Sequence, residues 1–443
     1  MSPASSPSLL FHVKHGVPKM IAPASPTPRE LKPLSDIDDQ EGLRFQIPFI
    51  FFYKSNPSVE GSDPISVVRE ALGKALVYYY PLAGRLKEGP NRKLVVDCTG
   101  ELGVLFIAAT ADIRFEQFGG SIRPPFPNLD EFLYNVPGSD GILGCPLLLI
   151  QVTRLSCGGF ILALRLNHTI CDAFGIVQFL KTMSEMAKGA KFPSIPPVWQ
   201  RELLNARTPP RITCSHQEYQ DPTTSTTPSS NGPNTANFIQ RSFFFGPNEI
   251  KAIRRHLPPN FPRCSQFVLL TACLWKCRTS ALEFDPEQDV LMFSLVNARG
   301  KSFGALGLPS GYYGNAFAYP AAVAKAGDLC RNSLGFAVEL MKKAIAEVSE
   351  EYFRSVADLM VIRGRPLYKT VGIFFVSDNR HVGYEEVDFE WGSPEYAGLA
   401  TSFPVISFYM RCKSEGEEGV VVPISLPLVA MERFQQELEK MIT

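Results

Sequence analysis

A single stretch without regular structure divides the 443-residue chain into two halves of similar length. Residues 221–236 read DPTTSTTPSSNGPNTA, which is rich in Ser, Thr and Pro and shows no hydrophobic periodicity. A chain of this length also exceeds what one hydrophobic core usually supports. We therefore predict an N-terminal domain over residues 1–205, a crossover linker over residues 206–236 and a C-terminal domain over residues 237–443.

The two halves end in the same order of sequence patterns. PLLLIQVTRLSCGGFILALRL contains two strand-like runs around a Cys-Gly-Gly turn, and a helical pattern follows over residues 173–190. PVISFYMRCKSEGEEGVVVPISLP again contains two strand-like runs around a polar turn, and a helical pattern follows over residues 430–442. Further helical patterns cover residues 65–80, 266–282 and 334–350. This mixture predicts an α/β fold of two similar domains, with mixed β-sheets and flanking helices.

Composition excludes several classes of function. The chain is 45% hydrophobic and 20% charged, with a formal net charge of zero and no block of like charge, so we expect no nucleic-acid partner. Its apolar runs are too short to span a bilayer, and the first residues lack the apolar core of a signal peptide. We therefore expect a cytoplasmic protein. Cys273 and Cys277 share a helix face, but no His or second Cys pair accompanies them, so we expect no metal site.

A histidine stands where an apolar strand pattern meets a helical pattern. Residues 160–166 are apolar apart from Arg165, and of the six histidines only His168 ends such a strand. Imidazole exchanges a proton near neutral pH, as a general acid or base must. Asp172 stands just before the helical pattern, where a carboxylate caps free N–H groups. Two interpretations remain open here: a catalytic pair, or a buried structural histidine beside an ordinary helix cap.

Five segments, in order along the whole chain, resemble the plant BAHD acyltransferases. HTICDAFG over residues 168–175 is similar to their HxxxDG motif, VDFEWGSP over residues 387–394 to their DFGWG motif, and GYYGNAF over residues 311–317 to a third motif. LSDIDDQEGLRFQIPF and YYYPLAGRLKEGPNRKLVVDCTGE resemble the alcohol acyltransferase and benzyl alcohol benzoyltransferase branch. The resemblance implies two chloramphenicol-acetyltransferase-like domains with the active-site channel between them. It also implies acyl-CoA as co-substrate and no permanently bound cofactor.

The resemblance further implies roles for individual residues. His168 would act as general base while the acyl group passes directly from coenzyme A to an alcohol, forming an ester. Trp391 would donate a hydrogen bond to the oxyanion. Asp388 is implied as a catalytic residue, although the matching aspartate looks structural in family members. Asp172 would pair with Arg299 and support the loop that carries His168.

Contacts with coenzyme A and two departures from the family pattern complete the expected site. Four contacts are expected, each of which also fits an ordinary helix cap or surface residue: Ser265 at a helix start, Arg278 on the same helix, and, from the family positions, Tyr313 and Ser377. Glu390 replaces the middle glycine of DFGWG, so the loop must rearrange if that position needs a positive φ. Phe174 is bulky beside the catalytic loop, and we expect it to narrow the substrate pocket.

We therefore predict a monomeric, metal-free, acyl-CoA-dependent alcohol O-acyltransferase whose partners are acyl-CoA and a small alcohol. Two alternatives stay open. One is a family member that uses an amine acceptor or a hydroxycinnamoyl donor. The other is an inactive relative that binds a ligand or a protein in the same channel.

Overall fold

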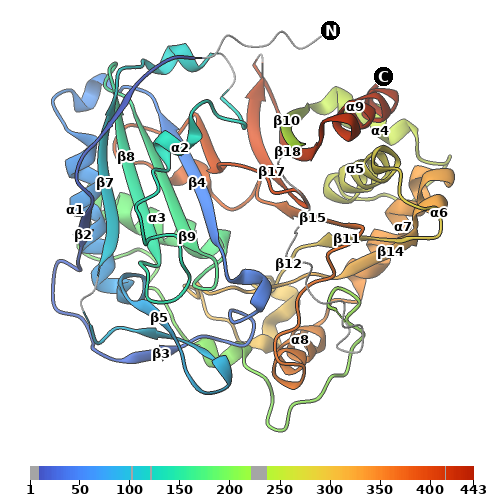
Figure 1. Ribbon diagram of the computed structural model, residues 1–443, viewed down its shortest axis with the longest axis horizontal. Coiled ribbons are helices and arrows are strands. Elements are labelled where there is room, and N and C mark those ends of the chain that lie inside the picture. Colours follow the sequence, from blue (N-terminus) through green and yellow to red (C-terminus); the bar gives the residue numbers. More distant parts are fainter. Residues whose placement is uncertain (1–8, 101–102, 120–121, 221–236, 415) are drawn as a thin grey trace.

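Two large β-sheets, one for each half of the chain, organise the fold (Figure 1). The computed structural model describes residues 9–100, 103–119, 122–220, 237–414 and 416–443. Of the predicted crossover linker, residues 206–220 are described, and residues 221–236 lie outside the described part.

The first sheet has seven strands in the order β1-β7-β8-β9-β4-β16, with β2 also paired to β7. Its strands are β1 (Val13–His15), β2 (Lys19–Ile21), β4 (Gln46–Tyr53), β7 (Val104–Ala111), β8 (Leu148–Leu155), β9 (Phe160–Asn167) and β16 (Tyr396–Leu399). Only β7 and β8 pair in parallel. The central strand β9 is almost wholly buried, which explains its nearly continuous apolar sequence. Helices α1 (Pro64–Tyr78) and α3 (Ala173–Ala187) pack together, and α1 contacts β8.

The second sheet has six strands in the order β10-β18-β17-β15-β11-β14. They are β10 (Phe238–Phe245), β18 (Glu417–Pro427), β17 (Ile406–Ser414), β15 (Ile373–Asp378), β11 (Asp289–Ser294) and β14 (Ala321–Lys325). Five helices group beside this sheet: α4 (Pro247–Arg255), α5 (Gln266–Leu282), α6 (Ala326–Arg331), α7 (Leu334–Ala346) and α9 (Leu428–Ile442) (Figure 1). Smaller elements are β3 (Leu31–Pro33), β5 (Arg85–Glu88), β6 (Leu94–Asp97), β12 (Val296–Asn297), β13 (Phe317–Ala318), α2 (Leu129–Phe132) and α8 (Glu350–Ile362).

The repeated order of strand, turn, strand and helix is confirmed. It is β8, β9 and α3 in the first half and β17, β18 and α9 in the second. The prediction of one helix over residues 334–350 is wrong, because α7 ends at Ala346 and α8 begins at Glu350. The Ser349 side chain accepts a hydrogen bond from the backbone N–H of Tyr352 and so caps a new helix.

Strand β16 comes from the second half of the sequence but completes the first sheet. It pairs antiparallel with β4, with Tyr396 opposite Phe52 and Leu399 opposite Phe49. The segment that precedes it, which carries the second motif, is thereby drawn to the first sheet. The two halves therefore share a sheet across the predicted domain boundary.

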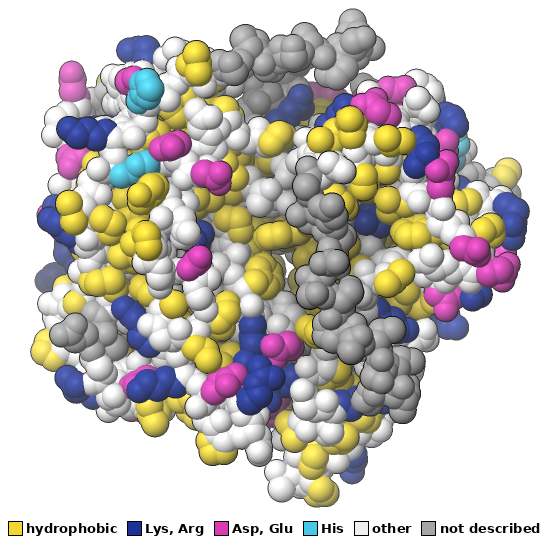
Figure 2. All heavy atoms as spheres, viewed as in Figure 1, with side chains coloured by type: hydrophobic (Ala, Val, Ile, Leu, Met, Phe, Trp, Pro, Cys, Tyr) yellow, Lys and Arg dark blue, Asp and Glu magenta, His cyan; other side chains and the backbone are white. Residues whose placement is uncertain are grey.

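The surface carries charges of both signs. On the face shown in Figure 2, basic and acidic side chains are intermixed, in keeping with a net charge of zero. In the part of the chain that the structure describes, no helix has both the length and the apolar character needed to cross a bilayer. Nor do these described residues bring together three or more His, Cys, Asp or Glu side chains in a group that could hold a metal ion.

Candidate active site

A cavity of about 270 Å³ lies between the two halves of the chain, and His168 forms part of its wall. The first half contributes β4 and the loop before α3, and the second half contributes β15 and its neighbours. Most of the lining is apolar, with a group of aromatic rings: Phe45, Phe49, Phe174, Phe317, Tyr319, Tyr368, Phe375 and Phe408. Such a lining suits an apolar group held away from water.

The loop after β9 places His168 at this cavity. Strand β9 ends at Asn167, whose side-chain oxygen accepts hydrogen bonds from the backbone N–H and the hydroxyl of Thr169 at 3.2 and 2.7 Å. This local bonding turns the chain out of the sheet. The backbone N–H of His168 donates to the carbonyl of Phe45 at 2.9 Å, and the two rings lie 5.3 Å apart.

The environment of His168 favours a neutral imidazole. Burial lowers the pKa of His168 below its ordinary value of 6.5, while its own backbone carbonyl, Asp172, Asn315 and Asp38 partly oppose this shift. Its Nδ1 atom is buried and has no hydrogen-bond partner among the described residues. The imidazole is therefore uncharged near neutral pH, in the form that accepts a proton.

Asp172 pairs with Arg299, and no hydrogen bond joins it to the imidazole of His168 among the described residues. Its oxygens accept from the two terminal nitrogens of Arg299 at 2.8 and 3.1 Å. They also accept from the backbone N–H of Gly175, at the start of α3, and of Ala316. Asp172 thus caps α3 and ties the loop before it to the second half.

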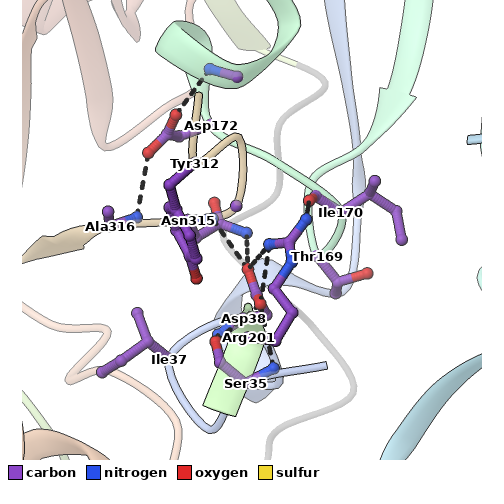
Figure 3. A network of polar contacts seen from close by, with 12 residues as sticks. Ser35, Ile37, Asp38, Thr169, Ile170, Asp172, Arg201, Tyr312, Asn315 and Ala316 are labelled. Atoms are coloured by element: carbon purple, nitrogen blue, oxygen red, sulfur yellow. Dashed lines mark hydrogen bonds and ion pairs between the residues drawn. The ribbon is translucent and has the colours of Figure 1, made fainter. Parts of the chain in front are cut away.

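A second buried carboxylate, Asp38, organises a larger cluster that the sequence patterns do not identify (Figure 3). It accepts from Arg201 at 2.9 and 3.0 Å and from both nitrogens of Asn315 at 2.9 Å. Asp38 and Asn315 are fully buried, and Arg201 is 1% exposed. Asp38 and Asn315 lie within segments that resemble the family, and this resemblance is the one sequence feature that could have identified them. Their contact joins positions far apart in sequence.

The structure does not bring Trp391 or Asp388 to His168. The indole N–H of Trp391 donates to the carbonyl of Gly158 at 3.2 Å. Gly158 precedes β9 and His168 follows it, and this strand of eight residues spans about 26 Å. Asp388 accepts from the backbone N–H of Gly392 and pairs with Lys188 at 2.8 Å. The structure therefore places both Trp391 and Asp388 in a loop remote from His168, where their side chains bond within the protein.

Glu390, beside Trp391, keeps the backbone conformation that a glycine would adopt. Its φ is +78°, in the region that L-residues enter only with strain. The side chain is exposed. The loop therefore accommodates Glu390 in a strained backbone and does not require a glycine.

Two of the four expected contacts with coenzyme A lie inside the protein. Tyr313 is buried and packs against Tyr79 and Trp199. The Arg278 guanidinium donates to the backbone carbonyls of Ile373 and Pro404, and burial lowers its pKa to about 10. The structure therefore places both side chains in the interior, where they bond or pack within the protein.

The other two expected contacts and Phe174 lie at the surface or the cavity. Ser377 lines the cavity and donates to the side-chain oxygen of Asn379 at 3.1 Å. Ser265 is exposed and caps α5 through the backbone N–H of Val268. Phe174 is half-buried and lines the cavity, with the Arg299 guanidinium 5.6 Å from its ring centre.

The chain is similar to known proteins in both sequence and fold. The sequence profile of the Transferase family matches residues 11–441. Alcohol acyl transferase 1 allele GSa of Malus domestica is 58% identical over 98% of this chain and 95% of that protein. Benzyl alcohol O-benzoyltransferase of Petunia hybrida is 54% identical over 100% and 96%. The crystal structure of F. sporotrichioides TRI101 complexed with coenzyme A and T-2 has a TM-score of 0.69 at 18% identity, covering 93% of this chain and 98% of that one.

Proposed function

The chain belongs to the Transferase family, that of the BAHD acyltransferases, and we propose that it transfers the acyl group of an acyl-CoA directly to an alcohol, with His168 as general base. The observation that carries this proposal is the position of His168. Its imidazole is kept neutral by burial and stands in the wall of an apolar cavity between the two halves. The names of the two plant relatives support an alcohol as the acceptor.

One imidazole suffices for the proton transfers. His168 takes the proton of the alcohol hydroxyl while the alcohol oxygen bonds to the thioester carbonyl carbon. A tetrahedral oxyanion forms, and its collapse breaks the carbon–sulfur bond. The coenzyme A thiolate leaves and recovers the proton from the imidazolium. Because the thioester is already activated, no acyl-enzyme is needed.

Asn379 is the proposed donor to the oxyanion in place of Trp391. It lines the same cavity as His168 and is 5% exposed. The Ser377 hydroxyl donates to the side-chain oxygen of Asn379. The amide N–H groups of Asn379 take no part in this bond and can donate to an oxyanion. A preorganised N–H in a site shielded from water stabilises a developing negative charge strongly.

The apolar cavity is proposed to hold the acyl chain and the alcohol, while the nucleotide end of coenzyme A binds outside it. The TRI101 protein, which shares the fold, forms a complex with coenzyme A, and this supports the same co-substrate here. Ser377 at the cavity and exposed Ser265 remain the proposed contacts.

The enzyme is also proposed to act as a cytoplasmic monomer. Both walls of the cavity come from one chain, so a second copy is not needed to complete the site. Four cysteines are buried as thiols, the state that a reducing compartment preserves: Cys98, Cys171, Cys273 and Cys277. Light scattering of the purified protein and imaging of a fluorescent fusion in plant cells test these two points.

Thiol release and product analysis test the proposed reaction. The purified protein is mixed with short, long and aromatic acyl-CoAs, crossed with aliphatic, terpenoid and aromatic alcohols. Release of coenzyme A together with the matching ester, identified by mass spectrometry, is the expected result. Amide formation with amine acceptors, or thiol release without an ester, would contradict the assignment. No turnover with any pair would instead indicate a binding protein.

A further inference from the structure

Buried side chains from distant parts of the chain hold two backbone carbonyls of the catalytic loop, and Figure 3 shows the contact at Ile170. The Nδ2 atom of Asn315 donates to the carbonyl of His168 at 2.8 Å. The Nη2 atom of Arg201 donates to the carbonyl of Ile170 at 2.8 Å. The loop that carries the imidazole is thus fixed through its main chain on both sides of Thr169.

Asp38 holds both of these donors. Arg201 Nη1 lies 2.9 and 3.0 Å from its two oxygens, and Asn315 donates to Oδ1 from its backbone and its side chain. Burial lowers the pKa of Arg201, but the combined attraction of Asp38, Tyr312, Tyr313 and Cys171 more than offsets this and raises it. Arg201 therefore stays charged, and charge-assisted hydrogen bonds are the strong and directional ones.

The amide of Asn315 fits this cluster in one orientation only. Its nitrogen faces two acceptors, Asp38 Oδ1 and the carbonyl of His168, while its oxygen has no partner among the described residues. Reversing the amide would set oxygen against two oxygens. The preceding residue must be glycine, because a Cβ on Gly314 would lie 1.7 Å from Arg201 Nη1.

We infer that Asn315 and Arg201, anchored on Asp38, are positioning residues that aim the His168 imidazole through the backbone of its loop. This inference rests on the proposed role of His168 as base. In a Ser-His-Asp triad a carboxylate bound to Nδ1 orients the ring, whereas Nδ1 of His168 has no partner among the described residues. This clamp joins Asp38 and Arg201 of the first half to Asn315 of the second.

The variant Asn315→Ala tests this inference against the matched control Ser35→Ala. The Ser35 hydroxyl also donates to Asp38, at 2.7 Å, but its side chain contacts neither loop carbonyl. Since a misplacement of about 1 Å can cost about 100-fold in rate, Asn315→Ala should lower kcat by about that factor with little change in the KM for acyl-CoA. Ser35→Ala should lower Tm and leave kcat close to that of the parent enzyme.

Two kinetic results would overturn the inference. One is a kcat for Asn315→Ala close to the parent value, and the other is an equal fall in kcat for both variants at a matched loss of Tm. A crystal structure of Asn315→Ala gives a readout without turnover, in which the His168 ring should be displaced. An unmoved ring would also overturn the inference. A parent protein without thiol release would contradict the proposed function alone, since the crystal structure still tests the clamp.

Discussion

Asp172 and Arg299 form a bidentate ion pair, at 2.8 and 3.1 Å, and no hydrogen bond joins this carboxylate to the imidazole of His168 among the described residues. The pair connects the cap of α3 to the second half of the chain. An aspartate four residues after a histidine therefore acts here through the loop that both share, and not as a direct partner of the ring.

Replacing Asp172 by Asn should reduce both stability and activity. Loss of the Asp172 charge leaves Arg299 partly buried without a charge partner, which typically costs about 3–5 kcal/mol. The double variant Asp172→Asn with Arg299→Met should recover part of the lost stability, because no lone charge remains. Denaturant unfolding of the parent, the two single variants and the double variant measures the coupling. Strictly additive losses would show that the two residues do not interact.

His168→Ala should abolish ester formation while leaving the protein folded, with exposed His256→Ala as the control that stays active. In the parent enzyme kcat/KM should rise with pH as the imidazole loses its proton, and level off above a pKa below 6.5. Asp172→Asn removes a negative charge that raises this pKa, so its acid limb should move to lower pH. A rate independent of pH across this limb would exclude His168 as the base.

Asn379→Asp should lower kcat by about 10²–10³-fold, because a carboxylate of similar shape replaces the N–H donor of the oxyanion. Trp391→Phe is the matched comparison. It removes one hydrogen bond to Gly158, worth about 1 kcal/mol of stability, at the far end of β9. Steady-state kinetics should therefore show normal kcat for Trp391→Phe. The opposite ranking would return the oxyanion role to the tryptophan.

Phe174→Ala should enlarge the cavity and favour longer acyl chains or larger alcohols. Each methylene in an apolar pocket discriminates by about 1–3 kcal/mol, which sets the scale of the shift. Phe179→Ala on the same helix is the control, because that ring is fully buried and its loss costs about 3–5 kcal/mol. The measurements are Tm and the ratio of kcat/KM for a short and a long acyl-CoA. A fall in Tm with an unchanged ratio would make Phe174 a core residue.

Glu390→Gly should stabilise the protein by about 1 kcal/mol, because glycine adopts the φ of +78° without the strain that an L-residue carries. Glu390→Ala should not, since alanine keeps the strain. Comparing Tm for the two variants separates backbone strain from the loss of the exposed charge. Equal Tm values would remove strain from the account of this loop.

The sequence predicted those features that depend on local pattern. The repeated strand–turn–strand–helix units, the position of His168 after an apolar strand and the cap at Asp172 all follow from short stretches. The Asp38 cluster does not, because its partners Arg201 and Asn315 are 163 and 277 positions away. The placement of Trp391 beside Gly158 could not be predicted for the same reason. The loop that carries Trp391 lies at the start of β9, beside Gly158. The pairing of β16 with β4, which draws the loop there, is a contact between distant segments.

Because β16 completes the first sheet, it also sets the order in which the newly made chain can finish folding. Strand β4 is synthesised early, but the edge formed by Phe49, Ile50, Phe51 and Phe52 has its partner only once residue 399 of 443 has been added. An open edge of this aromatic kind is a template for pairing with other chains. During translation that edge of the first half therefore stays open until about nine-tenths of the chain has been made.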